Sequence, residues 1–311
     1  MDHKDLRIVF MGTPEFALAS LDKLVTGGCN IVGVITAADK PGGRGMKMQQ
    51  SAVKKYAVEK GMHILQPEKL KDTVFLEELR SLKADLQAVV AFRMLPEVVW
   101  NMPPMGTVNV HGSLLPQYRG AAPINWAVIN GEEYTGVTTF KLQHEIDTGN
   151  ILLTEKVKIE STDDAGSVHD KLKEKGAGLL LTTIKGLAEG IIKEKPQALD
   201  ETVLKHAPKL ITETGKIDWS LPADKIHNLI RGLSPYPGAF GYLNGKMIKI
   251  FKAEKSIEKT VISPGNWKTD EKSFLKFACA DGYIFLKELQ PEGKKRMAVE
   301  DFLRGFRMQA P

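Results

Sequence analysis

The chain has 311 residues, of which 42% are hydrophobic and 26% charged, and its formal net charge is +5. This length allows two domains with separate cores, and the composition is ordinary for a soluble globular protein. No run approaches the roughly 18 apolar residues of a membrane helix, and the N-terminus has no secretory hydrophobic region, so a cytoplasmic protein is expected. Cys29 and Cys279 are lone and distant, which argues against a disulfide framework or a CxxC site.

The charge is unevenly distributed along the chain. Residues 1–208 carry 25 Lys and Arg against 26 Asp and Glu, whereas residues 209–311 carry 18 against 12, a balance of +6. A basic C-terminal part suits a polyanionic partner through phosphate contacts, although a lysine-rich soluble surface explains the same numbers equally well.

Strand-like and helix-like segments alternate through the first part of the chain. Strands are expected at 6–10, 31–35, 63–65, 86–91 and 108–111, and helices at 16–25, 52–60, 73–82 and 123–129, with a Gly/Lys/Arg loop at 37–50. Further strands at 136–142 and 151–159 precede a long helix at 168–188. This alternation predicts an α/β fold with a doubly wound, Rossmann-like, mostly parallel sheet, whose ligands bind beyond the carboxyl ends of the strands.

The last third of the chain has a different pattern. After a short helix at 222–231, strands are expected at 239–243, 247–253, 274–278 and 284–289, and turn pairs such as Asn244-Gly245 separate them. This spacing predicts a small C-terminal β-barrel, OB-like in kind. We therefore expect a catalytic domain at 1–190, a linker at 191–208 and a barrel at 209–311.

Two other motifs give little evidence of a function. The turn Gly12-Thr13-Pro14 lacks the G-x-G-x-x-G pattern of dinucleotide binding, so an ordinary strand-to-helix turn is expected there. His144, Glu145 and Asp147 stand close together, but no second cluster lies at a metal-ligand spacing. No metal is expected.

The strand that ends at His111 carries the strongest chemical signal. Asn109 and His111 lie two residues apart, so their side chains should leave the same face of the strand. An amide donor beside a general acid or base suits acyl transfer at a polarised carbonyl. Taken singly, Asn109 could end a strand and His111 could be a core histidine.

Asp147 follows His111 by 36 residues, in a turn between two expected strands. It could cap that turn through its own backbone, or it could hold and charge-stabilise an imidazole. The two interpretations of Asp147 alone are about equally good, and the Asn109–His111 pair favours the second.

These residues resemble a known family. The segment from Asn109 through Ser113-Leu114-Leu115-Pro116, followed by Asp147-Thr148-Gly149, is similar to the folate-dependent formyltransferases, and Tyr118-Arg119-Gly120-Ala121-Ala122-Pro123 and Thr135-Gly136-Val137-Thr138 extend the resemblance. The resemblance implies that Asn109, His111 and Asp147 are catalytic and that Ser113, Leu114, Leu115 and Pro116 border the site of 10-formyltetrahydrofolate. It also implies that the stretch Phe92-Arg93-Met94 lines the folate pocket, where Arg93 departs from the Ala-Tyr-Gly pattern usual in the family.

Within the family, the chain resembles members whose acceptor is methionine esterified to initiator tRNA. The loop Lys40-Pro41-Gly42-Gly43-Arg44-Gly45-Met46-Lys47, the segments Ile217-Asp218-Trp219 and Ser234-Pro235-Tyr236-Pro237-Gly238, and the closing Gly293-Lys294-Lys295-Arg296-Met297 carry this likeness. It implies tRNA contacts by Arg44, Lys47, Lys209, Lys294, Lys295 and Arg296, with no obligatory protein partner and a monomer expected. Arg44 taken alone could be only a solvated charge, and the likeness to the family favours the tRNA contact.

Two alternatives stay open. The same chemistry could serve another acceptor, either water or an amino sugar, although neither needs the basic loop and basic C-terminal part. A barrel-based RNA-binding protein without catalysis would leave Asn109, His111 and Asp147 without a purpose.

Overall fold

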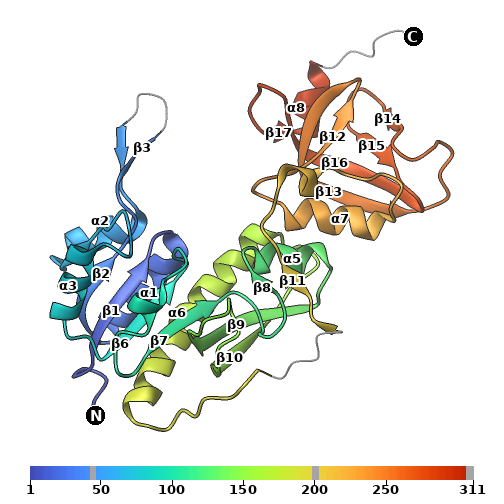
Figure 1. The fold of residues 1–311 in the computed structure, drawn as a ribbon. Helices are drawn as coiled ribbons and strands as arrows, with labels where there is room; N and C mark the ends of the chain where they lie inside the picture. The colour runs from blue at the N-terminus through green and yellow to red at the C-terminus, as the bar shows by residue number, and fades with distance from the viewer. Residues whose placement is uncertain (43–46, 198–202, 306–311) are drawn as a thin grey trace. The chain divides into compact units, whose positions relative to one another are not determined.

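The computed structural model describes residues 1–42, 47–197 and 203–305, and residue 47 only by its backbone. The chain divides into two compact units (Figure 1). Unit 1 comprises Met1–Gly120, Thr135–Val157 and His169–His206, and unit 2 comprises Ala121–Tyr134, Lys158–Val168 and Ala207–Pro311. No helix of the described residues is long and apolar enough to cross a membrane.

Unit 1 is built on a seven-stranded sheet with the order β10-β9-β7-β6-β1-β2-β5. Its strands are β1 (Arg7–Gly12), β2 (Asn30–Ile35), β5 (Ile64–Leu65), β6 (Leu86–Val90), β7 (Thr107–His111), β9 (Tyr134–Lys141) and β10 (Ile151–Lys158). The pairs from β5 to β7 are parallel, whereas β9 runs antiparallel to β7. The predicted mostly parallel, doubly wound sheet is therefore confirmed.

Helices cover both faces of this sheet (Figure 1). They are α1 (Glu15–Thr26), α2 (Ala52–Glu59), α3 (Thr73–Ser81), the short α4 (Glu97–Trp100) and α6 (Ala165–Ala188), of which residues 165–168 belong to unit 2. On one face Phe75, Leu76 and Leu79 of α3 and Val99 of α4 pack with Val89 of β6 in one buried cluster. On the other, Gly176 of α6 lets the helix approach Val110 of β7, since a Cβ there would lie 3.1 Å from the valine.

Helix starts follow the chemistry of their first residues. Ser51 and Asp72 cap α2 and α3, because their side chains accept hydrogen bonds from the backbone N–H groups of Lys54 and Phe75. Gly12 ends β1 where a Cβ would lie 2.5 Å from that of Ala17, so the turn before α1 requires a residue without a side chain. This packing agrees with an ordinary strand-to-helix turn.

The segment 37–50 was expected to be a loop, and that expectation is wrong in part. Lys40–Gly42 (β3) and Lys47–Gln49 (β4) pair as an antiparallel hairpin. Strands of only three residues, one of them containing Pro41 and Gly42, are too short to show an alternating apolar pattern, so they could not be predicted from periodicity. The short β8 (Arg119–Gly120) and β11 (His206–Ala207) likewise had no such pattern.

Unit 2 contains a curled antiparallel sheet that forms a half-barrel, with the order β12-β13-β16-β15-β14 and β17 on β16. Its elements are α5 (Pro123–Ile129), the 3-10 turn η2 (Thr212–Gly215), α7 (Ala223–Gly232), β12 (Ala239–Leu243), β13 (Lys246–Ile257), β14 (Trp267–Thr269), β15 (Leu275–Ala278), β16 (Gly282–Pro291), β17 (Met297–Ala298) and α8 (Val299–Arg304). Ile226 and Ile230 of α7 and Leu303 of α8 share a core with Ile250 and Leu286 of the sheet. The predicted barrel-like domain is confirmed.

Candidate active site

The strand order of the sheet reverses between β1 and β6, one strand away from β7. After β5 the chain returns to the other side of β1 and continues as β6 and then β7. In doubly wound sheets ligands bind beyond the carboxyl ends of the strands where the order reverses in this way. Both the segment after Val90 of β6 and the end of β7 at His111 lie at this edge.

Asn109 and His111 leave the same face of β7, as the alternation of a strand requires. The register partner of Asn109 is Val89, which belongs to the buried cluster on the α3 and α4 side of the sheet. The Asn109 side chain is half-buried, whereas His111 is only 7% exposed. The polar pair therefore stands at the border between an apolar core and solvent.

The His111 ring is held by a backbone carbonyl seven residues along the chain and by an aromatic side chain. Its Nε2 lies 2.9 Å from the Tyr118 carbonyl oxygen, and because a carbonyl only accepts, Nε2 carries the proton of that bond. The ring meets Phe140 edge-on, with the ring centres 6.5 Å apart. The ring nitrogen left for proton exchange is thus Nδ1.

Asp147 faces that nitrogen. Its Oδ2 lies 3.7 Å from His111 Nδ1, and both side chains are nearly buried. The same Oδ2 accepts a hydrogen bond of 3.0 Å from the Gly120 N–H. Asp147 has φ = +56°, a left-handed conformation that is uncommon outside glycine but tolerated by aspartate.

The turn that carries Asp147 leaves no room for a side chain at Gly149. A Cβ on Gly149 would lie 1.6 Å from the carbonyl oxygen of Lys141, which no rearrangement of a side chain could relieve. The Lys141 N–H also binds the Asn150 carbonyl oxygen at 3.0 Å. The turn is consequently packed directly onto the end of β9.

The predicted folate-border segment Ser113, Leu114, Leu115 and Pro116 follows directly after β7. The buried Ser113 hydroxyl donates to the Gln117 carbonyl oxygen at 2.6 Å. Thr138 of β9 donates to the Ser113 carbonyl oxygen and accepts from the Leu115 N–H. These bonds hold the segment against β9.

The stretch Phe92-Arg93-Met94 follows β6 at the same edge of the sheet. Met94 is 73% exposed, which is unusual for a methionine. The guanidinium of Arg93 lies over the Phe92 ring, 5.5 Å from its centre, and donates to the carbonyl oxygens of Pro67 and Glu68. Arg93, where the sequence departs from the family pattern, thus ties its own loop to the segment that follows β5.

The residues predicted to contact tRNA fall into three groups. Arg44 lies outside the described residues, and Lys47 is described only as part of the β3–β4 hairpin. Lys209, Lys294 and Lys295 are exposed in unit 2, the latter two in the turn between β16 and β17.

Arg296 is engaged within unit 2. It donates to both carboxylate oxygens of Glu288, and its guanidinium lies 4.3 Å from the centre of the Phe251 ring. Its geometry is that of a residue that stabilises β13 and β16. This competes with the predicted tRNA contact.

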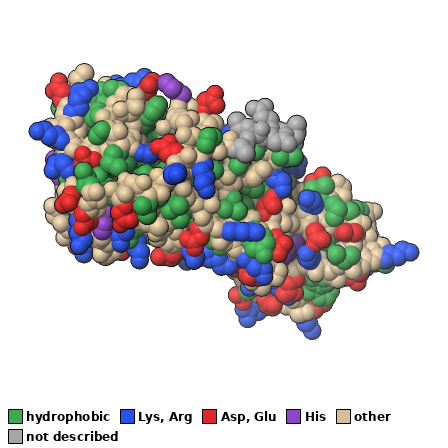
Figure 2. Space-filling view, turned by 90° about the horizontal axis from the view of Figure 1, so that it is seen from below, with side chains coloured by type: hydrophobic (Ala, Val, Ile, Leu, Met, Phe, Trp, Pro, Cys, Tyr) green, Lys and Arg blue, Asp and Glu red, His purple; other side chains and the backbone are tan. Residues whose placement is uncertain are grey.

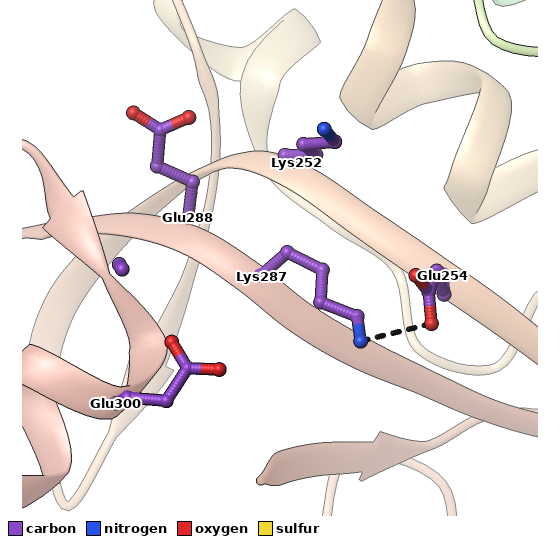
Figure 3. A pocket seen from close by; sticks show the side chains of 6 residues that line it. Lys252, Glu254, Lys287, Glu288 and Glu300 are labelled. Carbon is purple, nitrogen blue, oxygen red and sulfur yellow. Dashed lines mark ion pairs between the residues drawn. The ribbon is translucent and has the colours of Figure 1, made fainter. Parts of the chain in front are cut away.

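Figure 3 shows a pocket of unit 2 close to this ion pair, with a volume of about 390 Å³. It is lined by Lys252, Glu254, Lys287, Glu288, Ala298 and Glu300, and Lys287 pairs with Glu254 at 2.9 Å. Acidic side chains thus offset the lysines, so the pocket does not present the single positive sign expected of a phosphate site.

Among the described residues, no group of three or more His, Cys, Asp and Glu side chains has the geometry to hold a metal ion. His144, which the sequence places near Asp147, pairs instead with Glu97 at 3.3 Å and is exposed.

Three contributors to the site were not predicted: the Tyr118 carbonyl, the Gly120 N–H and the Phe140 ring. Two of them are backbone groups, which every residue carries, so a sequence gives no sign of which ones are used. Together with Asn109, His111 and Asp147 they form a small polar site that has an amide donor and, beside a carboxylate, a ring nitrogen that can exchange a proton. Such a site can stabilise a negatively charged oxygen and move a proton.

The fold defines an α/β protein with a second unit that contains a half-barrel. The chain belongs to the formyl transferase family: residues 6–184 match the family model described as formyl transferase, and residues 209–307 match its C-terminal domain.

Curated relatives span the full chain. A protein named methionyl-tRNA formyltransferase from Parabacteroides distasonis is 55% identical over 319 residues, covering 100% of this chain and 98% of its own length. Proteins of the same name from Bacteroides thetaiotaomicron and Flavobacterium johnsoniae are 53% and 50% identical, covering 99% and 97% of this chain and 98% and 96% of their own lengths.

Solved structures share the fold at lower identity. An N-formyltransferase from Helicobacter canadensis, solved with folinic acid and dTDP-3-aminofucose, has a TM-score of 0.68 at 20% identity and covers 92% of this chain and 99% of its own. HypX from Aquifex aeolicus, solved with tetrahydrofolic acid, has a TM-score of 0.66 at 19% identity and covers 96% of this chain but 48% of its own.

Proposed function

We propose that this formyl transferase moves the formyl group of 10-formyltetrahydrofolate to the amino group of methionine esterified to initiator tRNA. The observation that carries the proposal is the full-length similarity, at 50–55% identity, to relatives named methionyl-tRNA formyltransferase. The folate donor is supported by the solved complexes of more distant relatives with folate compounds.

The proposed chemistry starts with attack of the methionine amine on the formyl carbon. A carbon–nitrogen bond forms, the formyl oxygen becomes negative, and the bond between the formyl carbon and N10 of the folate then breaks. We assign Asn109, and His111 when protonated, to the stabilisation of the oxyanion. One proton must leave the attacking nitrogen and one must reach N10.

The geometry supports His111 and Asp147 as the proton carriers. Because His111 Nε2 is bound to the Tyr118 carbonyl, Nδ1 exchanges the proton, and it does so 3.7 Å from the Asp147 carboxylate. That distance exceeds a hydrogen bond, so a small approach, or a water molecule between the groups, would complete the route.

The donor is proposed to bind between the loop of Phe92, Arg93 and Met94 and the segment Ser113, Leu114, Leu115 and Pro116. The exposed apolar side chain of Met94 supports a flat apolar ligand at this edge. Arg93 is assigned to holding the loop rather than to contacting the donor, because its guanidinium binds the carbonyls of Pro67 and Glu68.

The acceptor tRNA is proposed to contact Arg44 and Lys47 of the hairpin segment and Lys209, Lys294 and Lys295 of unit 2. Residues 1–190 then act as the catalytic domain and 209–311 as the tRNA-binding domain. The proposal places the reaction in the cytoplasm and requires no protein partner.

A single assay tests this function. The purified chain is incubated with 10-formyltetrahydrofolate and with methionyl-tRNA charged on either initiator or elongator tRNA. Formylmethionine should appear on the initiator and far less on the elongator. Release of formate without any acceptor would point to water as the acceptor instead, formylation of an amino sugar alone would point to that substrate, and tRNA binding without any turnover would point to a non-catalytic RNA-binding protein.

A further inference from the structure

One side chain from the segment after α6 reaches the Asp147 turn. Lys195 bridges to Ile151 of β10, and two residues later Gln197 is 9% exposed. Its Nε2 donates two hydrogen bonds of 2.8 Å, one to the Asp147 carbonyl oxygen and one to that of Gly149. This segment was predicted to be a linker, but Gln197 is buried inside unit 1.

The other end of the same amide is also occupied. Gln197 Oε1 accepts from the Arg119 guanidinium, at 3.1 Å from Nε and 2.5 Å from Nη2. Carbonyls only accept and a guanidinium only donates, so the orientation of the amide is unambiguous. Its two donor hydrogens and two acceptor sites are therefore all used.

These contacts close a ring around Asp147. Arg119 is followed in the chain by Gly120, whose N–H binds Asp147 Oδ2 at 3.0 Å. Asp147 is thus held at two points: its carboxylate by the Gly120 N–H and its backbone carbonyl by the Gln197 amide. The residue so held has the uncommon φ of +56°, which the surrounding structure must maintain.

We propose that Gln197 is a positioning residue that keeps the Asp147 carboxylate in reach of His111, with Arg119 fixing the amide. This rests on the proposed catalytic role of Asp147. A misplacement of about 1 Å at a reacting group costs up to about 100-fold in rate, so the effect should appear in kcat.

The test compares Gln197→Met with Gln197→Glu. Methionine keeps the volume but offers no donor or strong acceptor, whereas glutamate keeps the bond to Arg119 and cannot donate to the two carbonyls. Both variants should lower kcat for formyl transfer about 10- to 100-fold, with the KM for the formyl donor within about twofold of wild type.

A double-variant cycle separates positioning from general damage. If Gln197 acts through the Asp147 carboxylate, adding Gln197→Met to Asp147→Asn should cost less than about threefold in single-turnover rate. Gln87→Ala is the matched control. Gln87 is a buried glutamine near the amino end of β6, away from the Asp147 turn, and its side chain accepts a hydrogen bond from the Thr107 hydroxyl. This control should lower the melting temperature and leave kcat near wild type.

Unchanged kcat in folded Gln197→Met and Gln197→Glu would overturn the proposal, as would fully additive losses in the cycle. Circular dichroism and donor binding check that each variant is folded. If Gln197→Met does not fold, the test uses Gln197→Glu alone. Failure of wild type to formylate any tRNA would instead refute the proposed function, so the two failures are distinguishable.

Discussion

At the scale of single residues, the site depends on side chains whose surroundings leave them few alternative roles. Asn109 is half-buried on β7, next to a nearly buried His111 that is held by a backbone carbonyl. Neither side chain is needed to complete the sheet, because the strand pairs through its backbone. Their removal should therefore affect chemistry more than stability.

Asn109→Ala should lower kcat about 100- to 1,000-fold, the usual cost of removing one oxyanion donor, about 3 kcal/mol. The melting temperature should fall by only a few degrees. Steady-state formylation of methionyl-tRNA and a thermal unfolding scan check this, with Asn101→Ala, an exposed asparagine after α4, as the matched control. A kcat within threefold of wild type would remove Asn109 from the mechanism.

His227 provides a residue-scale test of stability in unit 2. Burial is the main cause that lowers the pKa of His227 below its ordinary 6.5, assisted by the charges of Lys255 and Arg231; the hydrogen bond to the Ala253 carbonyl and the charge of Asp224 oppose this shift but do not cancel it. Its Nε2 donates to the Ala253 carbonyl at 3.2 Å. The folded state thus favours the neutral ring.

The sign of the pH dependence follows. Above pH 6.5 the ring is neutral in both the folded and the unfolded chain, so its contribution to stability is complete. As the pH falls below 6.5, the unfolded state takes up a proton first and the folded state loses stability. Relative to His227→Gln, wild type should lose melting temperature between pH 7.5 and 5.5; parallel curves for the two proteins would contradict this.

At the scale of elements, the sequence predicted what periodicity and turn chemistry control. The runs around Val9 and Val89 are nearly continuous apolar stretches and became central strands, because a parallel sheet buries both faces. The long helix ends near its predicted bound at Ala188. The hairpin β3–β4 and the short α8 carry too few residues for a recognisable period.

The candidate site likewise has a part that the sequence predicts and a part that depends on tertiary contacts. Asn109 and His111 could be paired from spacing alone, since a strand fixes which residues share a face. The approach of Asp147 to His111 depends on the Gly149 contact with Lys141 and on Gly120, which are tertiary features. The bonds of Gln197 to backbone carbonyls could not be predicted, because no local pattern marks a backbone acceptor.

The loop after β6 gives the element-scale prediction. Arg93 joins it to the Pro67–Glu68 segment by hydrogen bonds from its guanidinium. Arg93→Ala should loosen the loop and raise the KM for the formyl donor about 3- to 10-fold, with kcat changed less, because we expect roughly 1 kcal/mol of loop positioning to be lost in total, about the net contribution of one typical hydrogen bond. Fluorescence titration with a folate analogue checks this.

The matched control is Arg80→Ala, an exposed arginine in the last turn of α3 in the same unit. It removes the same charge without touching the loop, so donor binding should stay at the wild-type value. Equal weakening in both variants would show that net charge, and not the loop anchor, controls donor binding.

At the scale of the whole molecule, the question is how a net charge of +5 could attract tRNA. On the face drawn in Figure 2, Lys and Arg side chains are interspersed with Asp and Glu. In unit 2, Lys255, Lys287 and Arg304 pair with Asp224, Glu254 and Asp301. If the basic excess of the C-terminal part attracts tRNA, as proposed, the cations that are not already paired should contribute most.

Lys294 and Lys295 are such cations, since both are exposed and the described residues show no ion pair of either side chain. Arg296, next in the chain, is bound by Glu288 and packs on Phe251. We therefore expect two different roles for these three adjacent basic residues. The pair should contribute to tRNA affinity, and the arginine to the stability of the half-barrel.

Replacing Lys294 and Lys295 together by alanine should weaken binding of methionyl-tRNA and lower the slope of log K against log salt by up to about 2, because each phosphate contact releases about 0.9 counterion. Arg296→Ala should instead lower the free energy of unfolding by about 1 kcal/mol, as for an exposed ion pair with a ring contact, and so lower the melting temperature, while the salt slope stays unchanged. Filter-binding titrations between 50 and 200 mM salt separate the two results. A reduced slope in Arg296→Ala, with wild-type stability, would mean that the arginine leaves Glu288 to bind phosphate when the tRNA arrives.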